Sequence, residues 1–367
     1  MNLERILCAN AKDIKTHGRQ SARKTPYIPL FWTASGIELN ITGSELWLEY
    51  ECRYGDEGEA YLRVEIDGAD MLRFMLEEGI NKVCIFRGYT TDGIKNVRIL
   101  RENQGSTTVV NAVALHTDGT LLPLPPKKLH IEFIGDSVTS GEGLAGAKHH
   151  ELWIPCIFST REHYALLTAK ALDADVSIVS QSGWGVYSSW YNNTFEAVPR
   201  IYEQVCGAAL SEAQQEYGSL DTYDFAGASF DAVVVNLGTN DCTAFTIPEW
   251  VDENGTPHKQ HLDDNGHPCR EAADRVANAV ISFCRRIRAL NPDALILWCY
   301  NMLSDLLNDV IKDAVLRYAN ENGDNKAFAV MLPHADPSTD GSRQHPGPLA
   351  HRMYADVIIK ELSAHLK

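Results

Sequence analysis

A serine, an asparagine and a histidine, far apart in the sequence, are of the types that together can cleave an ester. Ser137 ends a Gly-Asp-Ser triplet, Asn240 lies in the run NLGTND, and His345 stands directly before a proline. A serine hydroxyl attacks an acyl carbonyl when an imidazole removes its proton, and amide N–H groups stabilise the oxyanion. Taken singly, each motif also fits a turn, a helix cap or a solvated loop.

A glycine-rich run followed by aromatic residues is a fourth candidate motif. Gly183 lies in the run QSGWG, where glycines let backbone N–H groups approach a ligand closely. Trp184, Tyr187, Trp190 and Tyr191 follow, and exposed aromatic rings can stack on sugars. Residues 184, 187 and 191 would also share one face of a helix, so a core helix is the alternative interpretation.

Short, almost continuous apolar runs in the C-terminal part predict the strands that would position these motifs. Such runs are typical of strands buried on both faces of a parallel sheet. They comprise residues 129–134, 175–180, 231–236, 294–300 and 327–332. Helical patterns separate them, and one opens with a capping-box pattern from Ser159 to Glu162 and runs to about Leu172. We therefore predict a doubly wound α/β layer with a five-stranded parallel sheet of flavodoxin-like order.

The four motifs fall at one edge of this predicted sheet. Ser137 follows the first run, Gly183 the second and Asn240 the third. His345 precedes the last predicted helix. Because ligands of open α/β sheets bind at the carboxyl ends of the strands, we expect these residues to converge.

The N-terminal third has a different periodicity. From about Tyr27 to Thr117, short segments rich in Val, Ile, Leu and aromatic residues alternate with Gly, Asp and Asn clusters. This spacing predicts an antiparallel β-sandwich of the jelly-roll kind. The proline-rich segment Leu121–Pro126 is predicted to be a stiff linker, which gives domains at residues 1–124 and 125–367.

Composition excludes several classes of protein. The chain has 367 residues, a formal net charge of −16 and 44% hydrophobic residues, which fits a globular protein and disfavours nucleic acid and anionic membranes as partners. No run of about 18 apolar residues occurs, so we predict no membrane span. Nine cysteines without a CxxC pair favour reduced thiols. The first residues lack the apolar core of a secretion signal, which predicts a cytoplasmic location unless a signal has been removed.

The four motifs in this order resemble the SGNH (GDSL-type) hydrolase superfamily over about residues 129–367. With a jelly roll in front, the chain looks like carbohydrate esterase family 2, whose members deacetylate sugars of plant polysaccharides. The stretches His17–Arg19 and Phe31–Glu38 resemble the N-terminal module of that family. The resemblance implies a carbohydrate O-acetylesterase for acetylated xylan, mannan or glucomannan, or their oligosaccharides, with no metal and no other cofactor.

The resemblance also implies roles for individual residues. Ser137 would be the nucleophile and His345 the general base. The oxyanion hole would consist of the Ser137 N–H, the Gly183 N–H and the Asn240 side-chain amide. Trp184 and Trp190 would bind substrate.

One position departs from the superfamily pattern, which has an Asp three residues before the histidine. That position is Ser342 here, and the acid nearest upstream is Asp340. Either a bulge lets Asp340 reach His345, or a main-chain carbonyl orients the imidazole in a Ser–His dyad, as members of carbohydrate esterase family 2 are known to do. The sequence leaves both alternatives open.

Other interpretations remain as alternatives. The same nucleophile could serve an esterase, lipase or thioesterase for another short-chain ester, or the chain could be a non-catalytic carbohydrate-binding relative. The long segment 242–270 contains His258, His261, His267 and Cys269. Because their spacing fits no closed structural metal site, a loop at the rim of the substrate site or in an oligomer contact is the preferred interpretation.

Overall fold

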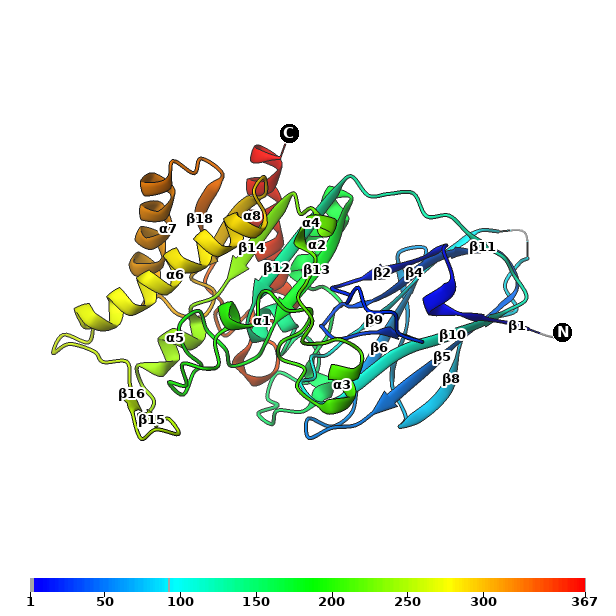
Figure 1. The fold of residues 1–367 in the computed structure, drawn as a ribbon, viewed down its shortest axis with the longest axis horizontal. Helices are drawn as coiled ribbons and strands as arrows, with labels where there is room; N and C mark the ends of the chain where they lie inside the picture. The colour runs from blue at the N-terminus through cyan, green and yellow to red at the C-terminus, as the bar shows by residue number, and fades with distance from the viewer. Residues whose placement is uncertain (1–2, 92, 367) are drawn as a thin grey trace. The chain divides into compact units, whose positions relative to one another are not determined.

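The computed structural model describes residues 3–91 and 93–366. The chain divides into two compact units, which are drawn in Figure 1. The first contains Met1–Lys127, Leu152–Arg161 and Gln204–Tyr223, and the second contains Lys128–Glu151, Glu162–Glu203 and Asp224–Lys367. The sequence prediction placed one boundary after Leu124 and did not foresee that two later segments belong to the first unit.

Two antiparallel sheets form the first unit. One has the strand order β1-β10-β5-β8 with β3 paired to β10, and the other has β11-β4-β9-β6-β7 with β2 paired to β4. The strands are β1 (Glu4–Leu7), β2 (Ile14–His17), β3 (Ile28–Pro29), β4 (Gly36–Ile41), β5 (Glu45–Arg53), β6 (Tyr61–Ile66), β7 (Ala69–Met75), β8 (Gly79–Arg87), β9 (Lys95–Arg101), β10 (Val109–Thr117) and β11 (Leu121–Leu122). Alternate side chains such as Ile37 and Leu39 of β4 and Leu46 and Leu48 of β5 fill their common core. The predicted β-sandwich is confirmed.

The linker prediction is wrong at its first two residues. Leu121 and Leu122 form β11 and pair with Ile41 and Asn40 of β4. The ladder stops at Pro123, because a proline has no N–H to donate to a neighbouring strand.

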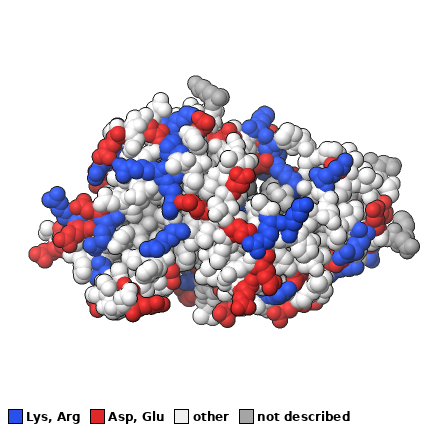
Figure 2. All heavy atoms as spheres, viewed as in Figure 1, with Lys and Arg blue, Asp and Glu red and all other residues white. Residues whose placement is uncertain are grey.

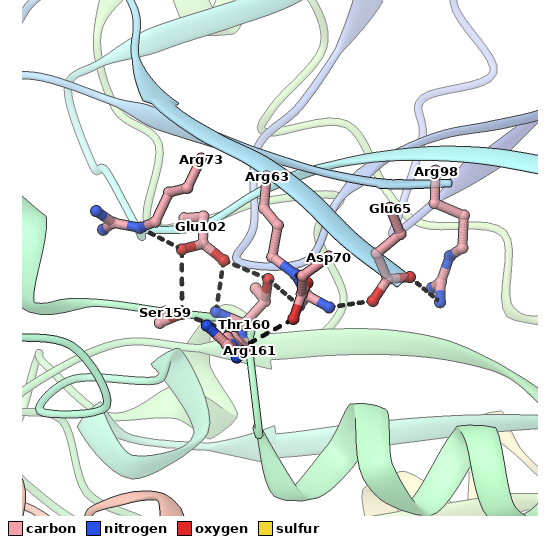
Figure 3. Close-up of polar contacts among 9 residues, drawn as sticks. All are labelled: Arg63, Glu65, Asp70, Arg73, Arg98, Glu102, Ser159, Thr160 and Arg161. Atoms are coloured by element: carbon pink, nitrogen blue, oxygen red, sulfur yellow. Dashed lines mark hydrogen bonds and ion pairs between the residues drawn. The ribbon is translucent and has the colours of Figure 1, made fainter. Parts of the chain in front are cut away.

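A buried glutamate binds the segment Leu152–Arg161 within the first unit. Glu102, which is fully buried, accepts hydrogen bonds from Ser159 Oγ at 3.1 Å and from the Thr160 N–H at 2.8 Å (Figure 3). Ser159 Oγ accepts the N–H of Arg161 at 3.0 Å instead of that of Glu162, and Glu162 has φ 59°, outside the helical region, so the predicted capping box is wrong. Helix α2 instead spans Tyr164–Leu172, and its N-cap is His163, whose side chain accepts from a backbone N–H.

The stretches His17–Arg19 and Phe31–Glu38 bind the segment Gln204–Tyr223, which is the second later segment of the first unit. Arg19 Nη1 donates to the Gln204 carbonyl at 2.8 Å, and Trp32 Nε1 donates to the Val205 carbonyl at 2.7 Å. Both side chains are almost completely buried. Since a buried donor without an acceptor is destabilising, these residues tie the segment Gln204–Tyr223 to the sandwich.

The second unit is a parallel sheet with the strand order β13-β12-β14-β17-β18. The strands are β12 (Leu129–Gly135), β13 (Ala174–Ser180), β14 (Ala232–Asn236), β17 (Leu295–Tyr300) and β18 (Ala327–Met331), and a small hairpin adds β15 (Trp250–Val251) and β16 (Pro257–His258). Parallel pairing of β12 with both β13 and β14 places the first strand inside the sheet. This is the flavodoxin-like order, so the predicted doubly wound layer is confirmed.

The longest helices of the second unit pack in two pairs, α2 with α8 (Pro348–His365) and α6 (Arg270–Leu290) with α7 (Asn308–Asn322) (Figure 1). The shorter helices of the described residues are α1 (Ser137–Ser140), α3 (Glu212–Glu216), α4 (Phe225–Ala228) and α5 (Thr239–Ala244), with 3-10 turns at Cys8–Asn10, Pro155–Ile157, Val198–Arg200 and Ser342–Gln344. Val276, Val280 and Phe283 form the buried face of α6. Across the described residues, no helix has the length and apolar character that a bilayer span requires. On the face drawn in Figure 2, basic and acidic side chains are intermingled.

Candidate active site

Ser137 and His345 lie together at the carboxyl end of β12. Ser137 is the first residue of α1, and the Asp136 carboxylate caps this short helix by accepting the Val138 N–H at 3.1 Å. His345 Nε2 lies 2.9 Å from Ser137 Oγ. The serine is 7% exposed, so the residue is largely shielded from water. The arrangement provides a nucleophile hydrogen-bonded to a base.

A main-chain carbonyl orients the imidazole. His345 Nδ1 lies 2.9 Å from the carbonyl oxygen of Arg343, so Nδ1 carries the proton and Nε2 accepts from Ser137. Arg343 and Gln344 have φ values of 54° and 56°, in the left-handed region that non-glycine residues rarely adopt. Such a conformation costs about 1–3 kcal/mol per residue and persists only when the surrounding structure enforces it.

Asp340 does not reach the imidazole. It forms an antiparallel bridge with Pro346, and the neighbouring Gly341 N–H donates to the His345 carbonyl at 2.7 Å. Within the described part of the chain, the Asp340 side chain makes no hydrogen bond with His345. Of the two alternatives that the sequence left open, the geometry corresponds to the main-chain carbonyl.

The loop before His345 is held by the segment that follows α1. The Ser342 N–H donates to the Gly143 carbonyl at 3.0 Å, and the Arg343 N–H donates to the His150 carbonyl at 2.8 Å. Gly143 has φ +85°, and a Cβ there would lie 2.5 Å from the Cβ of His345. A glycine is therefore required where these two segments meet.

Besides the Ser137 N–H, the predicted oxyanion donors follow two further strands of the sheet, Gly183 after β13 and Asn240 after β14. As the first residue of α1, Ser137 has a backbone N–H with no intrahelical acceptor. Asn240, at the start of α5, directs its Nδ2 toward the Trp184 carbonyl at 3.1 Å and Asp136 Oδ2 at 3.3 Å. Gly183 has φ +82°, which glycine adopts without strain.

Trp190 lies directly against Gly183. The backbone N–H of Trp190 donates to the Gly183 carbonyl at 2.9 Å, and a Cβ on Gly183 would approach Trp190 Cδ1 to 3.0 Å. Trp190 is 44% exposed, whereas Trp184 is half-buried. An exposed indole is thus placed beside a predicted oxyanion donor.

Asp241 fixes this loop, and sequence reasoning assigned it no role. Its buried carboxylate accepts the N–H groups of Val186 and Tyr187 at 2.8 Å and that of Ser188 at 3.1 Å. These N–H groups bind Asp241 and the segment is not helical, so the alternative interpretation, in which residues 184, 187 and 191 share one face of a core helix, is wrong. The last residue of the NLGTND run was the available signal.

Asp136 is electrostatically unusual. Burial raises its pKa to about 7, and the nearby carboxylates of Asp241 and Glu142 add to this effect, while the Val138 N–H opposes it. Its contact with Asn240 places a titrating carboxyl next to a predicted oxyanion donor.

Glu142 is a second residue that the sequence did not indicate. It follows α1 directly, it is 2% exposed, and its Oε1 lies 3.7 Å from His345 Nε2. Arg343 Nη1 donates to Oε1 at 2.9 Å, and Ser182 Oγ donates to Oε2 at 2.8 Å. No sequence pattern connects residues that approach only through three separate loops.

The segment 242–270 contains a hydrogen-bonded histidine. His258 Nε2 lies 3.1 Å from Asp252 Oδ2 in the β15–β16 hairpin. Among residues 3–91 and 93–366, no three or more His, Cys, Asp or Glu side chains gather as a group that could hold a metal ion.

Comparison with known families shows which family the chain belongs to. Residues 131–358 match the model of the GDSL-like Lipase/Acylhydrolase family. The chain belongs to this family. The predicted membership of the GDSL-type superfamily is thereby confirmed, and the matched region includes Ser137, Gly183, Asn240 and His345.

Individual relatives of this GDSL-like hydrolase are carbohydrate esterases by name. Acetyl xylan esterase Est2A from Butyrivibrio proteoclasticus is 37% identical, with a TM-score of 0.96 over 100% of this chain and 99% of that chain. An acetylxylan esterase / glucomannan deacetylase from Cellvibrio japonicus is 27% identical over 90% of this chain and 84% of that protein. A family two carbohydrate esterase from Clostridium thermocellum, solved in complex with cellohexaose, has the same fold, with a TM-score of 0.80 at 24% identity over 96% of this chain and 99% of that one.

Some relatives are longer proteins. Cellulase/esterase CelE from Acetivibrio thermocellus is 24% identical over 91% of this chain, but this GDSL-like chain spans only 37% of CelE. A second Cellvibrio japonicus acetylxylan esterase / glucomannan deacetylase is matched over 64% of its length.

Proposed function

We propose that the chain is a carbohydrate O-acetylesterase that removes acetyl groups from acetylated plant polysaccharides or oligosaccharides of the xylan, mannan or glucomannan type. The observation that carries the proposal is the 2.9 Å contact between Ser137 Oγ and His345 Nε2. It occurs in a chain that is 37% identical, over its whole length, to an acetyl xylan esterase.

The hydrogen bonds of the site indicate the order of the reaction steps. As Ser137 Oγ attacks the acetyl carbonyl carbon, its proton passes to His345 Nε2. The resulting oxyanion is stabilised by the N–H groups of Ser137 and Gly183 and by the Asn240 amide. When the tetrahedral intermediate collapses, the sugar oxygen leaves with the proton from Nε2, and an acetyl group remains on Ser137.

Water completes the cycle by the same steps. His345 takes a proton from water, the hydroxide attacks acetyl-Ser137, and acetate leaves as Ser137 recovers its proton. All proton transfers pass through one nitrogen. The second nitrogen keeps its proton on the Arg343 carbonyl throughout, which holds the ring in a productive orientation.

Trp190 and Trp184 supply the sugar-binding part of the proposal. Trp190 presents an exposed ring next to Gly183, where the acyl group of a substrate would meet the oxyanion donors. An amphipathic indole provides apolar contact to a sugar face together with a polar N–H. We therefore place the sugar ring that carries the ester against these two side chains.

Acetate release from a panel of acetylated xylo-, manno- and glucomanno-oligosaccharides tests the proposal, and the deacetylated position is determined by NMR. Wild-type protein should release acetate, and Ser137→Ala should not. A clear preference for an octanoyl over an acetyl ester of one alcohol would indicate a lipase instead. Binding of oligosaccharide without acetate release would indicate a non-catalytic carbohydrate-binding protein.

A further inference from the structure

We infer that Glu142 is a positioning residue for the Ser137–His345 pair, and that its carboxylate stabilises the imidazolium that forms when Ser137 loses its proton. The inference rests on the proposed function, because it concerns the base of that reaction. Glu142 itself acts through His345 and needs no contact with the substrate.

The carboxylate is fixed at a short distance from the atom that receives the proton. Glu142 Oε1 lies 3.7 Å from His345 Nε2, and the side chain is almost completely buried. Ser182 Oγ donates to its other oxygen at 2.8 Å, and the Glu142 N–H donates to the Ser137 carbonyl at 3.0 Å. Charges that are held this close and away from water interact much more strongly than exposed ones.

The site requires such a charge because the usual acid is absent. In a serine triad, a carboxylate on Nδ1 orients the ring and also stabilises the imidazolium. Here Nδ1 faces the neutral Arg343 carbonyl, which fixes the orientation but supplies only a dipole. Glu142 brings a full negative charge to the other side of the same ring.

Arg343 holds the ring on one side and the carboxylate on the other. Its carbonyl accepts from His345 Nδ1 at 2.9 Å, while its Nη1 donates to Glu142 Oε1 at 2.9 Å. The guanidinium compensates a carboxylate that would otherwise be buried and unpaired, which makes the buried charge tolerable. Because the two side-chain charges are opposite, their removal should affect the imidazolium in opposite directions.

Three other titratable groups lie near His345, and their charges bear on the same pH profile. His351 of α8 is fully buried, and burial, together with His163 and His345, holds its pKa well below the usual range, so it stays neutral. Asp136 at the start of α1 has a pKa raised to about 7, and Asp340 lies in the histidine's own loop. Because Glu142 contributes to the raised pKa of Asp136, both variants below are also measured in an Asp136→Asn background, and a shift that persists there belongs to His345.

The test is the pH dependence of nitrophenyl acetate hydrolysis by the full chain. In Glu142→Gln, kcat/KM should fall about tenfold or more at pH 7, and the acid limb of the profile should move down by about one pH unit. Arg343→Gln keeps the main-chain carbonyl but removes the cation, so the acid limb should move up. Glu321→Gln is the matched control, because Glu321 forms an exposed ion pair with Arg317 on α7 and should leave the profile unchanged.

The direction of the two shifts decides the outcome. Acid limbs that stay in place, or that move the same way in Glu142→Gln and Arg343→Gln, would mean that the pair only supports the fold, and the inference would be overturned. Should Glu142→Gln not fold, Glu142→Asp keeps the charge but withdraws it by one methylene. It should then show a smaller downward shift, and an unmoved limb would again overturn the inference.

A separate substrate distinguishes this inference from the proposed function. Wild-type protein that hydrolyses nitrophenyl acetate but releases no acetate from acetylated oligosaccharides would refute the substrate class and leave the pH test of Glu142 valid. Oligosaccharide deacetylation with unmoved acid limbs would refute the role of Glu142 alone.

Discussion

The two loops that bring groups to Ser137 are held in opposite ways. The loop carrying Gly183 is held by one side chain, the buried Asp241 carboxylate, which accepts three backbone N–H groups. The loop carrying His345 is held by several main-chain hydrogen bonds in addition to the side-chain contacts of Ser342 and Arg343, and its imidazole donates to the Arg343 carbonyl. A carboxylate thus holds the backbone of the oxyanion loop, whereas a main-chain carbonyl orients the catalytic imidazole.

This difference determines which substitutions each side tolerates. On the oxyanion side, substitution of Asp241 removes the carboxylate that accepts the three backbone N–H groups. On the base side, any residue at position 343 has a carbonyl, but the carbonyl points at Nδ1 only while Arg343 and Gln344 keep their left-handed conformation. We therefore expect sensitivity to side-chain identity near Gly183 and sensitivity to backbone conformation near His345.

The largest loss of activity should come from substitution of the nucleophile Ser137 or the base His345. Ser137→Ala should lower kcat by on the order of 10³-fold or more with folding unchanged, because the nucleophile is lost. His345→Ala should approach the same loss, and the double variant should be no worse, since the two residues act as a unit. Single-turnover kinetics and circular dichroism check this, and a Ser137→Ala enzyme with a tenth of wild-type activity would refute the assignment.

The next largest effect concerns the oxyanion side. Asn240→Ala should lower kcat by about 10²–10³-fold while KM changes little, because the amide stabilises charge that exists only in the transition state. Steady-state kinetics on an acetyl ester separate the two parameters. A raised KM with unchanged kcat would instead make Asn240 a substrate-binding residue.

Asp136 makes the stability of the oxyanion side depend on pH. Its pKa is raised from 3.8 to about 7 in the fold. Between these pH values the folded protein keeps a proton that the unfolded chain has released, so this stability is present at low pH and is lost as the pH rises toward 7. We therefore measure the free energy of unfolding with urea at pH 5 and at pH 8. From pH 5 to pH 8 the wild-type value should fall by about 2–3 kcal/mol more than the value for Asp136→Asn, which has no carboxyl to titrate at this position. Equal falls in both proteins would show that Asp136 does not titrate in this range.

Asp241→Asn tests the carboxylate side of the comparison directly. An amide offers one acceptor oxygen to the N–H groups of Val186, Tyr187 and Ser188, and its NH2 group opposes them. The loop should loosen, and kcat/KM should fall by about tenfold to a hundredfold. Hydrogen exchange of these three amides should become faster, and unchanged exchange would mean that the carboxylate does not hold the loop.

The sequence predicted those features that depend on patterns within one continuous segment. The five parallel strands, most strands of the sandwich, the position of Ser137 after the first parallel strand and that of Asn240 after the third were readable, because an apolar run and the motif behind it are local. Strands β1 and β2 precede the range in which strands were predicted, and β11 was predicted to be part of the linker. The approach of His345 to Ser137 was expected from the common edge of the sheet, and the structure places the two in contact.

The parts that the sequence did not predict depend on contacts between distant segments. Glu142 meets His345 through three loops, and no residue pattern records that contact. The segment at Ser159 is bound by the distant Glu102 and begins no helix, and the alternative helix after Trp184 does not form where Asp241 accepts the backbone N–H groups. In each case the segment is bound by a buried carboxylate that is distant in the sequence.

Asp340→Ala tests the main-chain side of the comparison and should have the smallest effect. Because the Arg343 carbonyl already accepts from His345 Nδ1, removal of the Asp340 carboxylate leaves the tautomer and the ring orientation intact. We expect kcat to fall by less than about tenfold, whereas loss of a true triad acid typically lowers it by on the order of 10⁴. The backbone of Asp340 contributes its bridge to Pro346 whatever the side chain, so folding should be unaffected. A thousandfold loss with the fold intact would show that Asp340 is the acid after all and that both loops at Ser137 depend on carboxylates.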